Sequence, residues 1–155
     1  MTFQIHALPR APFEPLLGMN DAELSARRAC WRTADAEPGY PCRVSLEDAK
    51  AGERLLLANF EHLGEQSPFR ASHAVFVRPG AKRARPEPDT IPDAIRRRLI
   101  SVRGFDADWM MLAADMVDGD DLAATINAMF ANTDIAELHL HAAKPGCYLA
   151  RVTRD

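Results

Sequence analysis

The residues best suited to chemistry lie near the C-terminus, in the stretch HLHAAKPGCY at positions 139 to 148. Two histidines stand two positions apart, and a cysteine follows a Lys-Pro-Gly turn. Imidazole titrates near neutral pH, so His139 and His141 can act as acid, base or phosphate ligand. The stretch therefore predicts either a reaction centre or the polar side of a hairpin, and both histidines are candidate catalytic residues.

A metal site is another interpretation of the same pair. Side chains alternate along a strand, so His139 and His141 share one side with Glu137, about 7 Å apart at the backbone. Two imidazoles at that spacing reach one metal ion, but zinc takes three or four protein ligands. A further ligand would have to be a cysteine or one of the residues Glu61, His62 and His73. We assign no metal site from the sequence, since only two ligands can be named.

The opposite side of this strand is apolar, with Leu138, Leu140 and Ala142. We expect that side to face the core and the histidine side to face solvent. The position of Cys147 depends on the hairpin register. A two-residue Pro-Gly turn places Cys147 with the apolar side chains, whereas a bulged or three-residue loop places it with the histidines. Cys147 is therefore a conditional catalytic candidate.

A second group of polar residues lies earlier in the chain, around a predicted hairpin. The pair Glu61-His62 and the segment Ser67 to His73 face each other across this hairpin, so their side chains converge near its loop. Arg70 can bind a carboxylate or phosphate in a bidentate manner. An ordinary ion pair between Arg70 and Glu61 is the alternative. His73 joins the catalytic candidates on this reasoning.

Cations complete the candidate set. Arg43 follows Cys42 in EPGYPCRVSLEDA, and Lys144 stands in the C-terminal turn. We expect Cys42 to be packed, because buried small thiols are commoner than reactive ones. The candidate set is rich in imidazole and positive charge, which suits a pocket for a small anion. The ligand-binding candidates are Arg43, Glu61, His62, Arg70 and Lys144.

The rest of the chain predicts the elements that position these residues. Segments rich in Leu, Val and Phe indicate strands over residues 54–62, 72–78, 99–105, 109–117, 137–143 and 147–153. Asn20 and Glu23 form a capping box that opens a helix over residues 21–34. A second helix follows Asp120 or Asp121, with apolar residues at helical spacing: Leu122, Ile126, Met129 and Phe130. We therefore predict an α+β fold, a mainly antiparallel sheet of about six strands with two main helices packed on it.

The chain has the size of a single domain, residues 1–155. Its 155 residues, 47% of them hydrophobic, suffice for one core. Residues 1–18 are rich in proline, and residues 78–92 form a long loop with prolines and basic residues. Loops of that length are usually mobile or functional. A solvated excursion is the simpler interpretation of loop 78–92, and a local anion site with the arginines that follow it is the alternative.

Composition and motifs argue against several function classes. The net charge of -3 gives no reason to expect nucleic acid or an anionic membrane as a partner. No P-loop, GxGxxG fingerprint, GxSxG elbow or HExxH motif occurs, so any cofactor is unknown. No apolar run approaches the about 20 residues of a membrane span, and the N-terminus lacks the pattern of a signal peptide. Three cysteines without CxxC spacing are expected to be reduced. We expect a soluble, cytoplasmic protein.

Several stretches resemble a bacterial family known as domain of unknown function 1203. These stretches are PGYPCRVSLEDA, NFEH, SPFRASHAVFVR and HLHAAKPGCYLARV, with the FDA and VDG turns. The similarity runs from Ala22 to Val152. It implies a single-domain bacterial protein of this length, without an established activity or assigned catalytic residues. One departure from the family pattern is Ala142, where the resemblance leads us to expect an asparagine after the second histidine.

Three functional hypotheses follow from these residues. The first is a small-molecule enzyme or ligand-binding protein for a carboxylated or phosphorylated metabolite, with histidine as acid or base and arginine as clamp. The second is a non-catalytic binding or interaction module that uses the same cleft or loop 78–92. The third is a divalent-metal protein centred on His139 and His141. Whether the protein is an enzyme is left open.

Overall fold

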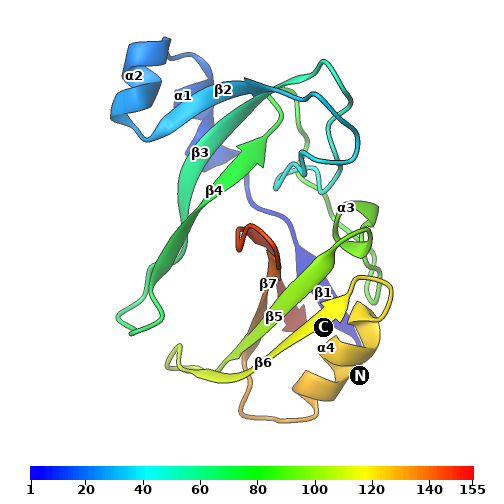
Figure 1. Ribbon diagram of the computed structural model, residues 1–155. Helices are drawn as coiled ribbons and strands as arrows, with labels where there is room; N and C mark the ends of the chain where they lie inside the picture. Colours follow the sequence, from blue (N-terminus) through cyan, green and yellow to red (C-terminus); the bar gives the residue numbers. More distant parts are fainter.

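The computed structural model describes residues 1–155 and contains two antiparallel sheets (Figure 1). One sheet has the strand order β2-β3-β4, with bounds Ala29–Thr33, Arg54–Leu63 and Ala71–Val77. The other has the order β1-β8-β7-β5-β6, with bounds Phe3–His6, Tyr148–Arg154, Glu137–Ala142, Leu99–Phe105 and Met111–Asp118. The predicted α+β class is confirmed, although the strands form two sheets.

The strands predicted from the sequence are all present, and β1 and β2 are added to them. β1 comes from the Pro-rich N-terminal segment and pairs with β8, from Phe3 opposite Arg154 to His6 opposite Arg151. This pairing brings both termini to the same side of the larger sheet (Figure 1). The first residues of the N-terminal segment are therefore an edge strand of the larger sheet.

The helix predicted over residues 21–34 is wrong in its extent. α2 spans only Asp21–Ala26, although the capping box is present. The Asn20 side-chain oxygen accepts from the backbone N–H of Glu23 at 2.9 Å, and the backbone N–H of Asn20 donates to the Glu23 carboxylate at 2.8 Å. The chain turns at Arg28, where φ is 56°, and then enters β2. Pairing of β2 with the central strand β3 satisfies its backbone and overrides local helix propensity.

The remaining helices are short, and they are η1 (Ala11–Phe13), α1 (Glu14–Leu17), α3 (Asp93–Arg96) and α4 (Leu122–Phe130). α4 confirms the second predicted helix, because Leu122, Ile126 and Phe130 are all buried. Asp121 precedes it without a side-chain capping bond. None of the helices combines the length and the apolar character that a bilayer crossing requires.

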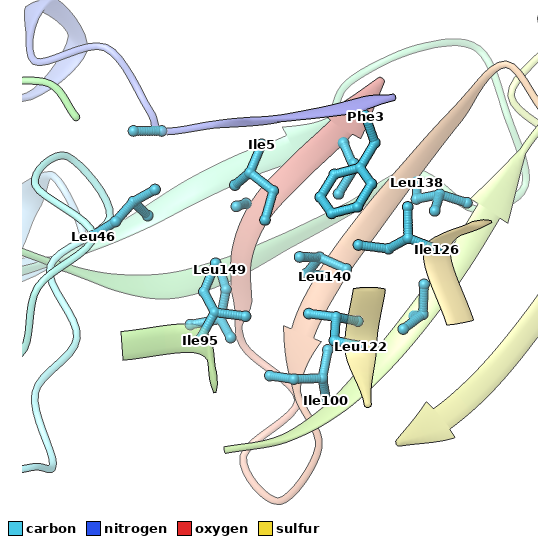
Figure 2. Close-up of a cluster of buried hydrophobic side chains, with 14 of the residues drawn as sticks. Phe3, Ile5, Leu46, Ile95, Ile100, Leu122, Ile126, Leu138, Leu140 and Leu149 are labelled. Carbon is cyan, nitrogen blue, oxygen red and sulfur yellow. The ribbon is translucent and has the colours of Figure 1, made fainter. Parts of the chain in front are cut away.

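The main core lies between one face of the larger sheet and α4, where β1, β7 and β8 contribute side chains (Figure 2). Leu138 and Leu140 of β7 are fully buried there, as predicted for the apolar side of that strand. A second apolar cluster covers the inner face of the smaller sheet, where Phe13, Leu24 and Tyr148 pack on it. The other face of β7 is thus free to meet the smaller sheet.

Loop 78–92 has no regular secondary structure, but it is docked on the body of the protein. The Asp89 carboxylate accepts from the backbone N–H of Phe3 at 2.9 Å, and the Pro86 carbonyl accepts from the Gln4 side chain at 2.8 Å.

The turn before α4 lies close to the backbone of α3. A Cβ on Gly119 would overlap the backbone carbonyl of Arg96.

Candidate functional site

Four of the five histidines meet where the two sheets face each other. His62 lies near the end of β3, His73 lies on β4, and His139 and His141 lie on β7. The His62 ring centroid is 4.9 Å from that of His73, 5.0 Å from that of His139 and 4.8 Å from that of His141. We call these four residues the histidine cluster. Each of them is a candidate site residue in the sequence analysis, and the fold brings all of them together.

The histidine side of β7 does not face solvent, so that prediction is wrong. His139 is 2% exposed and His141 is fully buried. The predicted alternation is correct, since the histidines point away from Leu138 and Leu140. The smaller sheet covers the histidine side, and alternation along one strand carries no information about what lies opposite it.

Hydrogen bonds engage both ring nitrogens of His139 and one ring nitrogen each of His62 and His141. The Nδ1 atoms of His62 and His139 lie 2.9 Å apart, and the His139 Nε2 bonds to the Glu137 carboxylate at 2.9 Å. The His141 Nδ1 bonds to the Gly146 carbonyl at 3.0 Å. Each contact joins a ring nitrogen to a fixed neighbour, so the rings are held in orientation.

The Nε2 atoms of three cluster members have no hydrogen-bond partner and are buried: His62, His73 and His141. One ligand nitrogen from each of these residues lies within 4.8 Å of the others. These are the residues that could hold a metal ion. The set differs from the sequence-based pair, because His139 is turned toward Glu137 and His62.

Burial keeps the rings of His62, His73 and His141 uncharged. It lowers the pKa of His62 to about 2 and that of His141 to about 3, and the neighbouring histidines add to the effect at His62. Burial and then the Arg103 charge lower the pKa of His73. Because the low-dielectric surroundings disfavour an imidazolium, these three rings are neutral near pH 7. A neutral ring offers one nitrogen lone pair to a ligand.

Tyr148 packs against the histidine cluster, although it is not among the candidates predicted from the sequence. Its ring stacks on that of His62, with a centroid distance of 4.9 Å and an interplanar angle of 16°. It also packs edge-to-face against His139 and His141, at centroid distances of 5.5 Å and 5.8 Å. Burial raises the pKa of Tyr148. The signal lay in the hairpin register, since Tyr148 stands directly opposite His141.

Cys147 lies away from the histidine rings. Residues 143–146 form the loop, closed by a bond of 3.0 Å from the Ala142 N–H to the Cys147 carbonyl, and Gly146 has φ 77°. A bulge in β8 follows Tyr148, so that His141 pairs with Tyr148 but Leu140 pairs with Ala150. The loop has an even number of residues, so Cys147 pairs with Ala142 and Tyr148 takes the place opposite His141.

Cys147 instead lines a cavity of about 550 Å³ together with Arg43 and Lys144. Arg43 is 3% exposed, and its Nε donates to the Tyr148 carbonyl at 2.7 Å. Its Nη1 donates to the Pro41 carbonyl at 2.5 Å, and no carboxylate pairs with it. Burial lowers the pKa of Arg43 to about 10, which leaves the guanidinium charged near pH 7.

Two further cations line this cavity, Arg97 and Arg98, and no carboxylate does. Arg98 is already neutralised, because the Asp48 carboxylate accepts from it at 2.6 Å and 2.9 Å. Arg97 has only a distant carboxylate neighbour, Asp93 at 3.9 Å. The cavity wall therefore carries positive charge that the protein leaves uncompensated.

The other candidates lie outside the cavity. Glu61 and Arg70 form an ion pair at 2.5 Å, and their side chains are 43% and 53% exposed. This is the ordinary ion pair expected from the sequence as the alternative to anion binding by Arg70. Cys42 is buried and accepts from the backbone N–H groups of Ser45 and Arg78, so it is packed as expected. All three cysteines are free thiols.

Comparison with known proteins gives a family and no activity. The family model described as "Protein of unknown function (DUF1203)" matches residues 39–154, a range that contains the histidine cluster and the cavity cations. No curated protein and no solved structure matches the chain. Since the match covers most of the 155 residues, the chain belongs to the DUF1203 family.

Proposed function

We propose that this protein binds a small anionic molecule in the cavity beside the tip of the β7–β8 hairpin. The observation that carries the proposal is Arg43, a guanidinium 3% exposed that has no carboxylate partner. A buried charge without a counter-ion costs several kcal/mol of desolvation free energy. A bound anion would offset that cost, because it supplies the missing charge at short range.

The cavity wall supports an anion with an apolar body. Lys144 and Arg97 add positive charge without a close carboxylate. The apolar part of the wall includes Leu57, Phe76 and Leu99. Small-molecule sites in proteins occupy roughly 300 to 1,000 Å³ and combine apolar walls with a few polar anchors. A carboxylate or phosphate monoester with an aromatic or aliphatic body fits this description.

The proposal is one of binding. Among the catalytic candidates only Cys147 lines the cavity, whereas His73, His139 and His141 do not. Acid–base catalysis by histidine on a ligand held by Arg43 therefore lacks support from the geometry, because general acids and bases must lie within hydrogen-bond reach of the reacting atom.

Thermal unfolding with matched ligands tests the proposal. Phenyl phosphate and benzoate should raise the melting temperature, and neutral benzyl alcohol should not, because only the anions pair with Arg43. Lys144→Gln should weaken phenyl phosphate binding about tenfold. Arg70→Gln is the matched control, since Arg70 lies in an exposed ion pair outside the cavity. Equal shifts for anions and the neutral alcohol, or equal weakening by both variants, would refute anion binding at this site.

A further inference from the structure

The histidine cluster contains an unusual arrangement of buried nitrogen atoms. The Nε2 atoms of His62, His73 and His141 are each buried without a hydrogen-bond partner. Leaving one such atom unpaired costs about 1 to 3 kcal/mol of folding free energy, and native proteins rarely do so. Three of them on neighbouring rings indicate a place built for something that bonds to nitrogen lone pairs.

The partners of the other ring nitrogens determine where the lone pairs are. A carbonyl can only accept, so His141 donates from Nδ1 to Gly146 and keeps its lone pair on Nε2. The Glu137 carboxylate likewise accepts a hydrogen bond from the Nε2–H of His139. An imidazole that carries its proton on Nε2 accepts at Nδ1, so the Nδ1 of His139 accepts from the Nδ1–H of His62, and the His62 lone pair stays on Nε2. His141 therefore shows the pattern of a metal-ligating histidine, whose second nitrogen is fixed by a carbonyl or a carboxylate.

We propose that His62, His73 and His141 bind one divalent transition metal ion through their Nε2 atoms. Their ligand nitrogens lie within 4.8 Å of one another. Tetrahedral zinc with Zn–N bonds of about 2.0 to 2.1 Å requires nitrogens about 3.3 Å apart, so the rings close on the ion by side-chain rotation. Two sheets supply the ligands, His62 and His73 from one and His141 from the other, so the ion would join them.

The charges around the cluster select the kind of metal. Arg103 lies near His141, and both Arg103 and Arg43 lie near His73, so the surroundings are largely positive. The carboxylate that bonds to the cluster, Glu137, is already bonded to His139 and Arg151. Magnesium and calcium need oxygen ligands with negative charge, which this site lacks. Zinc, nickel, cobalt and copper bind neutral imidazole, and three histidines leave one position open for water or an anion.

The inference goes beyond the proposed anion cavity, because none of the three ligands lines that cavity. It also differs from the sequence-based metal hypothesis. His139 becomes a positioning residue that orients His62 and is itself oriented by Glu137. Loss of a group that directly orients a metal-ligating histidine typically weakens metal binding about 10-fold to 100-fold, and Glu137 acts one step further out, through His139.

Metal titration of the untagged full chain, first freed of metal with a chelator, tests the site. We expect one Co²⁺ per chain, with the visible absorption of a four-coordinate ion, and competition by Zn²⁺. His73→Ala should weaken binding by more than about 100-fold, and Glu137→Gln by about tenfold. His73 is only half-buried, so this variant keeps a folded chain when circular dichroism is compared with that of the native protein.

Two controls make the result decisive. His6→Asn removes the histidine outside the cluster, which bonds to Thr153, and should leave Co²⁺ binding unchanged. Lys144→Gln should leave it unchanged as well, whatever its effect on anions. The proposal is overturned if the native chain binds no stoichiometric Co²⁺ or Zn²⁺. It is equally overturned if His73→Ala binds as well as the native chain, or if His6→Asn loses binding to the same degree.

Discussion

Acidification should destabilise the metal-free protein in a pH range where its carboxylates contribute little. The pKa values of His62 and His141 are lowered from 6.5 to about 2 and about 3, chiefly by burial. Both rings are therefore neutral in the folded chain, while in the unfolded chain they take up protons below pH 6.5. A group with a depressed pKa in the folded state binds fewer protons there, so stability is present above 6.5 and falls as the pH drops below it.

The size of the loss depends on the unfolded pKa, because both folded values lie far below the pH range used. From about pH 7 to about pH 5.5, each histidine removes about 1.2 kcal/mol of unfolding free energy. His62 and His141 together remove about 2.5 kcal/mol, and His73, whose pKa is also lowered, adds to this drop. Domains of this size have a total stability of about 5 to 15 kcal/mol, so the effect is large. Glu137 has a lowered pKa too, but its stabilisation is lost mainly below its ordinary value of 4.5.

Urea unfolding in the presence of a chelator measures this difference at the two pH values. His62→Gln and His141→Gln should each reduce the pH-dependent drop by about 1.2 kcal/mol, whatever they do to absolute stability. Tyr148 contacts the same rings but stays neutral throughout this pH range, so Tyr148→Phe should keep the full pH-dependent drop in unfolding free energy. The linkage reasoning is refuted if the native chain is equally stable at both pH values, or if both glutamine variants retain the whole drop.

Three further outcomes follow from the packing. Gly119→Ala should cost more than about 2 kcal/mol of stability in thermal unfolding, because its Cβ meets backbone, whereas Gly80→Ala, in open space, should cost under about 1 kcal/mol. Asp48→Asn should cost about 2 to 4 kcal/mol in urea unfolding, because it weakens a buried bidentate ion pair. Iodoacetamide should alkylate Cys147 in the folded protein far faster than the buried Cys42, as peptide mass mapping would show.

Much of the fold was predictable from local pattern. The hairpins over residues 54–77, 99–118 and 137–154 have apolar strands separated by turn residues, and the structure contains all three. α4 was predictable because Leu122, Ile126 and Phe130 repeat at helical spacing. β2 was not, since Asn20 and Glu23 signal a helix start correctly but do not show where the helix ends.

The division into two sheets was beyond local pattern for a physical reason. A strand pairs with whichever edge its backbone can reach, and that choice depends on contacts far apart in sequence. β1 and β8 pair across almost the whole chain, from Phe3 to Arg154. The covering of His139 and His141 by the smaller sheet is a contact of the same kind. Sequence alternation therefore predicted which side chains point together and failed to predict that the histidine side is buried.

The β7–β8 hairpin shows how a single step of register assigns residues to different sites. Cys147 and Tyr148 are neighbours, so their side chains point to opposite sides of β8. Because loop 143–146 has an even number of residues, the phenol of Tyr148 faces the imidazoles and the thiol of Cys147 faces the cavity with Arg43. The hairpin backbone serves both sites as well, since the Gly146 carbonyl orients His141 and the Tyr148 carbonyl holds Arg43. Residues 139–148, which form one continuous polar stretch in the sequence, are thereby divided between the histidine cluster and the cationic cavity.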